Sequence, residues 1–446
     1  MDINLHHSFT KPSTNGVSDS VNDLNVEIIR DTNSFDSLQD EWEELTDESD
    51  YFIYQTFEWN RVWWDYFGTG KQLHILALYK EGKLMGLIPL FWDTITLYDF
   101  KVYSSLRFLG SSVSQPDGEN LKGLHPYSDY LDIIIRPGHE KSVISSFIKY
   151  IEQQNLDFNE IVLDEIPECS TLWSTLLPAL HKKGIDYSVE NSSECPWVKL
   201  EGTWDDYQQS LSKKSRYNNN RALRMVDEDS EKGFHIREAE NSQELYQSFD
   251  LLVKLHQDRW NQLGFPGVFA EKRMYNFQRK IVSSFFKKGW VQIRMAEPVH
   301  DAGNTIAVDL LFKYKKHVYL VHRALDQDSP FSKAGPGNVL LSVAIKKAAD
   351  NGYKTLDFLR GTENFKFRTA NTVAQNKQIV IKNPSRKSGY RIEFLKTYIK
   401  LKRRMAIEWS QLLLFVQGKT ELKGFKGYVE FIHSRLSYKL AEWKKN

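Results

Sequence analysis

Cysteine is scarce in this chain of 446 residues, and no cysteine pair has the spacing of a metal or redox site. Cys169 and Cys195 are the only two, and they lie far apart in the sequence. A C-x-x-C motif and a disulfide framework are therefore excluded. We expect a reduced, cytosolic protein in which both thiols act as small apolar side chains.

The sequence also lacks the short motifs of several enzyme classes. H-E-x-x-H, G-x-S-x-G and G-x-x-x-x-G-K-[ST] are all absent. These motifs supply zinc ligands, the serine nucleophile of many hydrolases and the phosphate loop of many ATPases. The sequence therefore supports none of these three classes, and we expect no bound metal.

Long apolar runs are missing as well. The run Leu412–Val416 is far too short to span a membrane. The first residues carry neither a basic segment nor an apolar core, so we expect no secretory signal and a cytoplasmic protein.

The composition is that of a globular protein with two domains. Hydrophobic residues make up 41% and aromatic residues 13%, which is enough for a large core. The net charge of +1 does not indicate whole-surface attraction to nucleic acid. The charge is uneven, because residues 391–446 hold 13 Lys and Arg against 5 Asp and Glu.

Two stretches show the same order of helix, turn and strand, at residues 139–166 and 337–359. This repetition predicts a duplicated α/β domain, each copy a mixed, mostly antiparallel sheet flanked by helices. We expect a disordered tail at 1–24, domains at 25–200 and 201–385, and a basic helical tail at 386–446. The expected elements include strands at 73–79, 84–91, 129–135, 290–296, 305–313, 317–323 and 354–359, and helices at 209–228, 241–262 and 270–288.

The second copy begins with a glycine-rich loop, Ser332 to Asn338, that the first copy lacks. The amides of Gly335, Gly337 and Asn338 at a helix start, with Lys333 beside them, form a candidate phosphate site. The alternative is a tight turn before a helix, with no ligand.

Three stretches together resemble GNAT acetyltransferases, specifically the branch with CelD-like proteins and FemAB-type peptidyltransferases. They are residues 211–224, the Gly335-Pro336-Gly337 loop and the stretch 357–368, which reads D-F-L-R-G-T-E-N-F-K-F-R. The resemblance covers roughly residues 25–385. It implies two tandem GNAT-like domains, with acyl-CoA (acetyl-CoA) as co-substrate bound by the second domain.

The resemblance also implies roles for the strand at 317–323 and the residues after it. In GNAT-like proteins this strand pairs with the pantetheine arm of the donor, which makes Val321 a candidate contact. His322, with Asp326 near the same end, is a candidate general base because an imidazole titrates near neutral pH. The alternative for His322 is a structural histidine.

The stretch 357–368 holds further candidates. Glu363 can act as a general base, while Arg360 and Lys366 can bind an acidic acceptor or a phosphate. The alternative is an internal ion pair of Glu363 with Lys366 or Arg360, and for Asp357 we expect anchoring of the loop by hydrogen bonds.

Two basic segments remain. Lys214 and Arg216 belong to a basic helix that can contact a phosphate of the coenzyme, of tRNA or of a nucleotide-linked acceptor, or can simply face solvent. The helix expected at 391–416 has an apolar and a basic side, so it either rests on an anionic membrane surface or packs on its own domain.

We therefore expect an acyltransferase that moves an acyl group from acyl-CoA to an amino group. The acceptor would be a small molecule or sugar-linked, such as an amino sugar or an envelope or exopolysaccharide precursor. One alternative is a FemAB-like transferase that uses aminoacyl-tRNA, the only nucleic acid expected to bind. The other is a non-catalytic assembly partner, favoured by Ser332 where the GNAT loop usually has Gln or Arg.

Overall fold

The computed structural model describes residues 24–97, 100–112, 128–153, 156–226, 233–361 and 363–383. The predicted tail, apart from Leu24, and the predicted helical segment 386–446 lie outside the described residues. We refer to residues 24–200 as the first half and to residues 201–383 as the second half.

The first half contains β1 (Asn25–Ile29), α1 (Thr32–Ser37), α2 (Gln39–Asp47), the 3-10 helix η1 (Ile53–Gln55), α3 (Phe57–Phe67), β2 (Gln72–Lys80), β3 (Lys83–Leu97), β4 (Phe100–Phe108), β5 (Ile134–Ile135), α4 (Glu140–Gln153), β6 (Glu160–Ile166), α5 (Leu172–Lys183) and β7 (Tyr187–Lys199). The second half contains α6 (Trp204–Ser210), α7 (Lys213–Arg224), β8 (Phe234–Glu238), α8 (Ser242–Gln262), η2 (Val268–Ala270), α9 (Lys272–Lys287), β9 (Val291–Pro298), β10 (Ala307–Tyr314), β11 (His317–Leu325), η3 (Ser332–Ala334), α10 (Pro336–Asp350), β12 (Thr355–Asp357), α11 (Asn364–Thr369) and β13 (Thr372–Lys382).

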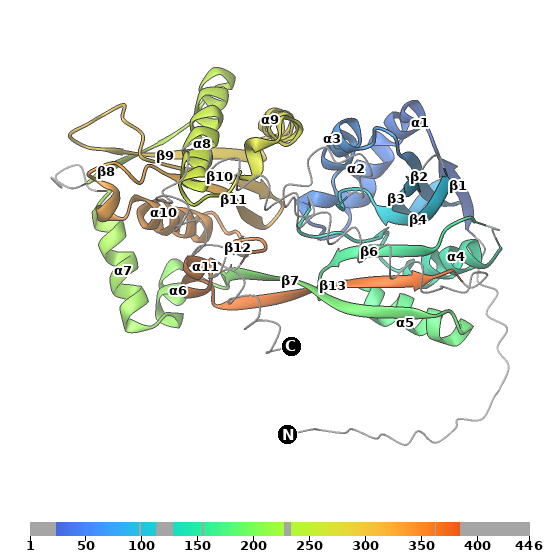
Figure 1. Cartoon of the computed structure of the whole chain (residues 1–446). Coiled ribbons are helices and arrows are strands. Elements are labelled where there is room, and N and C mark those ends of the chain that lie inside the picture. The colour runs from blue at the N-terminus through green and yellow to red at the C-terminus, as the bar shows by residue number, and fades with distance from the viewer. Residues whose placement is uncertain are drawn as a thin grey trace, which may run out of the picture.

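A single 13-stranded sheet passes through both halves (Figure 1). Its order is β1-β2-β3-β4-β6-β13-β7-β12-β11-β10-β9-β8, with β5 paired to β3. Most neighbours are antiparallel, and the β4–β6 and β11–β12 pairs are parallel. The predicted mixed α/β fold with helices on a largely antiparallel sheet is therefore confirmed.

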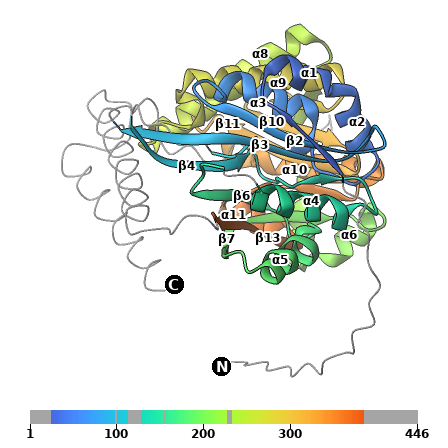
Figure 2. The ribbon, with the colours of Figure 1, turned by 90° about the vertical axis from the view of Figure 1, so that its right-hand side faces the viewer.

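Helices cover both faces of this sheet. Figure 2 shows α1, α3, α8 and α9 together on one side and α4, α5 and α6 on the other. The first group shares one apolar core, in which Trp42 and Trp59 of the first half join Phe277 and Phe312 of the second half. Because one core draws on both halves, neither half buries its apolar surface alone.

The last strand of each half is shared with the other half. β13 hydrogen-bonds to β6 of the first half over Lys377–Lys382 and to β7 over Thr372–Ile381. In return, Trp197–Lys199 at the end of β7 pairs with β12 of the second half. No single chain position separates the two sets of strands, and the predicted domain limits at 200/201 and 385 stay predictions.

The two halves differ where their central parallel strands separate. β11 pairs with β12 only over His317–Tyr319 and then continues to Leu325, with no strand on that side among the described residues. In the first half, β4 ends at Phe108, directly after its paired stretch, and the Leu131 amide bonds the Glu165 carbonyl beyond the paired part of β6 at 3.0 Å. Only the second half, among described strands, therefore keeps an open strand edge at this point.

Trp59 is a test of the shared core. Its ring lies 5.3 Å from Phe277 and 6.5 Å from Phe312, and its indole N–H donates to the Ser128 hydroxyl at 2.8 Å. We predict that Trp59→Ala lowers the free energy of unfolding in urea by about 3–5 kcal/mol, because a large cavity opens between the halves. Tyr217→Ala, at a 62% exposed position, should stay within about 0.5 kcal/mol of wild type. A decrease below about 1 kcal/mol at Trp59 would contradict the shared core.

Candidate functional site

The glycine-rich loop leads from the open edge of β11 into helix α10. Residues Ser332–Ala334 form η3, Gly335 takes the left-handed conformation at φ 80°, and Pro336 is the first residue of α10. A proline suits this first position because its missing amide would have no partner inside the helix. The local sequence thus explains why the helix begins at this point.

The amides of this loop are mostly engaged within it. The Gly335 N–H donates to the Ser332 carbonyl at 3.2 Å, and the Asn338 N–H donates to the Gly335 carbonyl at 2.9 Å. Among the three amides predicted for a phosphate, only that of Gly337 has no acceptor in the described part of the chain. The 3-10 turn engages the Gly335 amide and the first turn of α10 engages the Asn338 amide, so the expectation of several free amides is met at one position.

The loop packs against the end of β11. A Cβ atom placed on Gly337 would lie 3.2 Å from a methyl group of Leu325, so glycine permits this close approach. The side chains of Lys333 and Asn338, in contrast, are exposed beside the helix start. They remain available to an anion, while the Gly337 backbone is buried.

Val321 lies at an irregularity in β11. Leu310 of β10 faces His322 and Leu311 faces Leu320, which leaves Val321 as an extra residue. Such a bulge interrupts regular pairing and turns the backbone of one residue away from its neighbouring strand. The structure therefore places Val321 on the open part of β11, where the sequence predicts a donor contact.

His322 lies in an aromatic cluster under α8. Its ring is 5.0 Å from Phe269 and 6.0 Å from His256, and its Nε2 atom is buried without a hydrogen-bond partner among the described residues. Burial lowers its pKa to about 3, with smaller contributions from His256 and Lys366. The expectation that it titrates near neutrality is therefore wrong. A neutral imidazole can accept a hydrogen bond there but is a weak proton acceptor.

Asp326 organises the turn after β11. One of its carboxylate oxygens accepts the backbone N–H groups of Asp328 at 3.0 Å and Ser329 at 3.2 Å. This is the local bonding typical of aspartate in turns. The structure thus shows a turn-forming contact for this predicted catalytic residue.

Glu363 and Lys366 form the internal pair that the sequence offers as an alternative. Their charged groups are 3.2 Å apart, and the Lys366 ammonium also donates to the Arg360 carbonyl at 2.6 Å. Lys366 is buried, whereas the Glu363 side chain is half exposed at the start of α11. Of these two candidates, Glu363 is the one that solvent or a ligand can reach.

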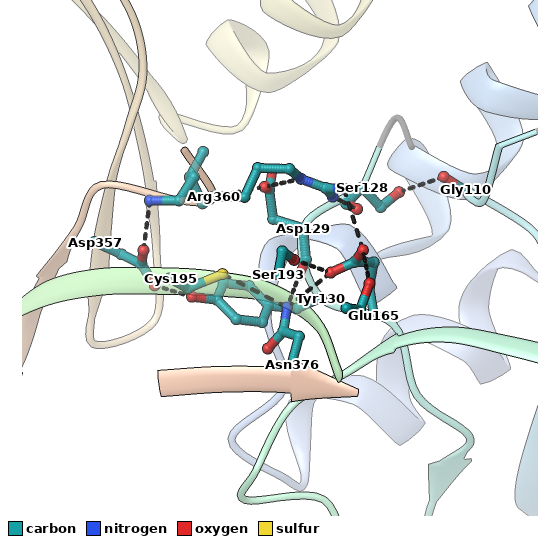
Figure 3. A network of polar contacts seen from close by, with 12 residues as sticks. Gly110, Ser128, Asp129, Tyr130, Glu165, Ser193, Cys195, Asp357, Arg360 and Asn376 are labelled. Atoms are coloured by element: carbon teal, nitrogen blue, oxygen red, sulfur yellow. Dashed lines mark hydrogen bonds and ion pairs between the residues drawn. The ribbon is translucent and has the colours of Figure 1, made fainter. Parts of the chain in front are cut away.

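Arg360 joins the two halves (Figure 3). Its Nε donates to Asp129 at 2.6 Å, Nη1 lies 3.3 Å from Glu165, and Nη2 donates to the Ser128 carbonyl. Asp129 and Glu165 raise the Arg360 pKa against the opposing effect of burial. The guanidinium is thus occupied by the first half, and the structure does not present it to a substrate.

The same network continues through the strands that the halves exchange (Figure 3). The Asn376 amide of β13 donates to the Asp129 carbonyl at 2.5 Å and to Glu165 at 3.1 Å, and it lies 3.6 Å from the Cys195 sulfur. Sequence reasoning missed Asp129, Glu165 and Asn376, since no local motif marks any of them.

Asp357 anchors the loop after β12, as the sequence predicts. Its carboxyl group accepts the Leu359 amide at 2.7 Å and the Tyr130 hydroxyl of the first half at 2.6 Å. Burial raises the pKa of this carboxyl to about 7.

The two basic candidates on α7 have different surroundings. The Arg216 guanidinium donates to the carbonyls of Gln208 at 2.9 Å and Gln209 at 3.2 Å, so it closes the end of α6. Lys214 is exposed and makes no ion pair among the described residues. The structure therefore leaves Lys214 available to a phosphate and assigns Arg216 a contact within the protein.

Within the described ranges, no group of three or more His, Cys, Asp or Glu side chains is placed to hold a metal ion. Over the same residues, no helix combines the length and apolar character needed to cross a membrane.

Comparison with known proteins identifies the domain that carries this site. Residues 213–367 match the family model described as an acetyltransferase (GNAT) domain. The solved structure of FemX is similar to this chain, with a TM-score of 0.54 at 11% sequence identity, covering 80% of this chain and 98% of FemX. The GNAT prediction is therefore confirmed for residues 213–367, and the fold of the described chain is similar to that of FemX.

Two further solved structures have lower similarity. L-PGS from Bacillus licheniformis has a TM-score of 0.46 at 12% identity, covering 82% of this chain and 96% of its own. The tandem GNAT protein from the clavulanic acid biosynthesis pathway has a TM-score of 0.42 at 8% identity, covering 81% and 100%. No curated protein matches the sequence.

Arg360 offers a test of the network between the halves. We predict that Arg360→Ala lowers the free energy of unfolding by about 3–5 kcal/mol, because it leaves the buried carboxylates of Asp129 and Glu165 without their cation. Lys183→Ala removes an exposed ion pair with Glu152 and should cost at most about 1 kcal/mol. Urea unfolding of both variants measures the difference. Equal decreases would show that the Arg360 network contributes no more than a surface pair.

Proposed function

From a GNAT domain at residues 213–367 within a FemX-like fold, we propose that this protein is an acyltransferase whose donor, an acyl-CoA such as acetyl-CoA, binds the second half. The acyl group would pass to an amino group on a small or sugar-linked acceptor. An amino sugar or a precursor of envelope or exopolysaccharide chemistry, modified in the cytoplasm, fits the resemblance in the sequence.

The observation that carries this proposal is the open edge of β11 next to the glycine-rich loop. Beyond Tyr319 the strand has no partner on one side among the described strands, and it leads directly to the exposed Lys333 and Asn338 at the start of α10. An extended pantetheine arm can pair with such an edge as an added strand does. Its diphosphate would then reach the Lys333 ammonium at the positive end of the α10 dipole.

Amine attack on the thioester carbonyl forms the amide, breaks the C–S bond and releases coenzyme A as its thiol. The step needs alignment of the two reactants and stabilisation of the oxyanion. The backbone near the Val321 bulge and the open edge supply fixed N–H groups for this purpose. His322 stays neutral, so it would orient an acceptor through a hydrogen bond. Among the predicted bases, Glu363 has a half-exposed side chain. It is therefore our candidate to accept the proton that the attacking amine releases.

Loop charge reversal tests the donor site. We predict that acetyl-CoA raises the melting temperature of wild type and that Lys333→Glu combined with Asn338→Glu abolishes most of this shift, because two carboxylates repel the diphosphate. Both positions are exposed, so the fold should survive. Lys182→Glu, exposed on α5 of the first half, is the matched control and should keep the shift.

The outcomes of that scan separate the proposals. An undiminished shift in the loop variant would place the donor elsewhere. No shift with acetyl-CoA in wild type, together with none on addition of charged tRNA, would favour a non-catalytic assembly partner that keeps the GNAT fold. Bound coenzyme A in purified protein, detected by mass spectrometry, would support the transferase independently.

A second candidate, transfer from aminoacyl-tRNA, is favoured by the surface of α7. Lys213, Lys214, Arg221 and Arg224 are all exposed on this helix, at the start of the segment that matches the GNAT model. Four cations on one short helix can follow a phosphate backbone.

Salt dependence tests this candidate. If tRNA binds α7, Lys213→Gln with Lys214→Gln should weaken tRNA binding and lower the slope of log affinity against log salt by about two, because each substitution removes one cation that neutralises a phosphate. Filter binding at several NaCl concentrations measures this slope, with Lys182→Gln as the control. An unchanged slope would exclude α7 as the tRNA site.

A further inference from the structure

A cavity lies at the opposite end of α10 from the glycine-rich loop. Its volume is about 370 Å³. One wall is made by strands, with Arg294 of β9, Lys313 of β10 and Val318 of β11, and the other by Lys347 and Asp350 near the end of α10. This volume is at the small end of the range of ligand sites in proteins.

Cations outnumber the carboxylates available to them in this cavity. Glu238 is shared, since one of its oxygens accepts from both Arg294 Nε at 3.2 Å and Lys347 Nζ at 2.8 Å. Asp350 pairs with Lys346 at 2.5 Å. Lys313 has no ion pair among the described residues, although three of its neighbours are charged.

Arg294 adds an unsatisfied donor. Only 4% of this residue is exposed, and its Nη1 atom has no hydrogen-bond partner in the described part of the chain. A buried guanidinium nitrogen without an acceptor is costly, so its partner is expected to be a bound group.

The pKa of Lys313, which lines the cavity with Arg294, is also shifted. Burial lowers the pKa of Lys313, and the positive charges of Arg294 and Lys347 lower it further, while Glu238 opposes them. The strand wall of the cavity is therefore electropositive. The carbonyls and the Asp350 carboxylate at the end of α10 repel an anion, which favours a position between the strand wall and the Lys347 ammonium.

We propose that this cavity binds a small multivalent anion of the phosphate or polycarboxylate class, held by Lys313, Arg294 and Lys347. Such an anion satisfies the free Arg294 nitrogen and gives Lys313 a counter-charge. The site is distinct from the proposed donor site, because it lies at the other end of α10 and on the side chains of β9 and β10.

Calorimetric titration of the whole protein with sodium phosphate and with sodium citrate, at fixed ionic strength, tests this proposal. We expect saturable binding of one or both to wild type. Lys313→Gln and Lys347→Gln should each weaken it by about tenfold or more, because each substitution removes a charge-assisted hydrogen bond. Lys316→Gln is the control, because Lys316 is exposed in the turn after β10 and does not line the cavity. Circular dichroism checks that each variant is folded.

Three results would overturn the proposal. They are the absence of saturable binding of either anion at millimolar concentrations, equal weakening by Lys316→Gln, and displacement of the anion by chloride alone at the same ionic strength. The last two would indicate general screening by a basic surface and not a built site. Binding of phosphate but not citrate, or the reverse, identifies which of the two chemical classes the cavity takes.

Discussion

The exchange of strands between the halves is the constraint on which the rest of the structure depends. β13 lies between β6 and β7, and the end of β7 pairs with β12, so main-chain hydrogen bonds join the two halves at three strand pairs. Separation of the halves would break all three strand pairs and leave their donors and acceptors unpaired. The halves therefore form one cooperative unit, and the position of α10 relative to the first half is fixed.

Side chains reinforce this constraint at the junction. Arg360 enters the first half to meet Asp129 and Glu165, while Tyr130 of the first half reaches Asp357. These contacts fix the short segment between β12 and α11, which leads to Glu363 and Lys366. Residues that resemble a catalytic motif in sequence thus serve largely to hold the two halves together. The residue types at positions 357–366 are therefore explained in part by contacts between the two halves.

Local structure could be predicted from the sequence far better than the site. The helix expected at 241–262 is Ser242–Gln262, and the strand expected at 317–323 is His317–Leu325, because apolar spacing determines both. The helix expected at 209–228 is instead two helices, since Ser212 caps a new start at Lys213. The strand expected at 129–135 is reduced to Ile134–Ile135, because the residues before it turn toward the junction.

The site could not be predicted to the same degree because its partners are remote in sequence. Arg360 meets Asp129 across 231 positions, and Asp357 meets Tyr130 across 227. No periodicity or motif encodes contacts of that separation. The shift of the His322 pKa has the same origin, since it follows from packing under α8. The loop could be identified from the sequence, because proline and glycine at a helix start act locally.

Two kinds of contact would hold a donor at the proposed site, one from the glycine-rich loop and one from the open edge of β11. The exposed Lys333 ammonium and the helix dipole at the start of α10 together supply a modest attraction for a diphosphate, of about 1–2 kcal/mol. The open edge of β11 beyond Tyr319 offers alternate N–H and C=O groups, and each hydrogen bond made there contributes about 0.5–1.5 kcal/mol. Several such bonds exceed the contribution of the loop. Recognition in this fold would therefore depend more on strand pairing with an extended donor than on the glycine-rich loop. β12 is only three residues long and pairs with β11 as far as Tyr319, which leaves the rest of that edge without a described partner strand.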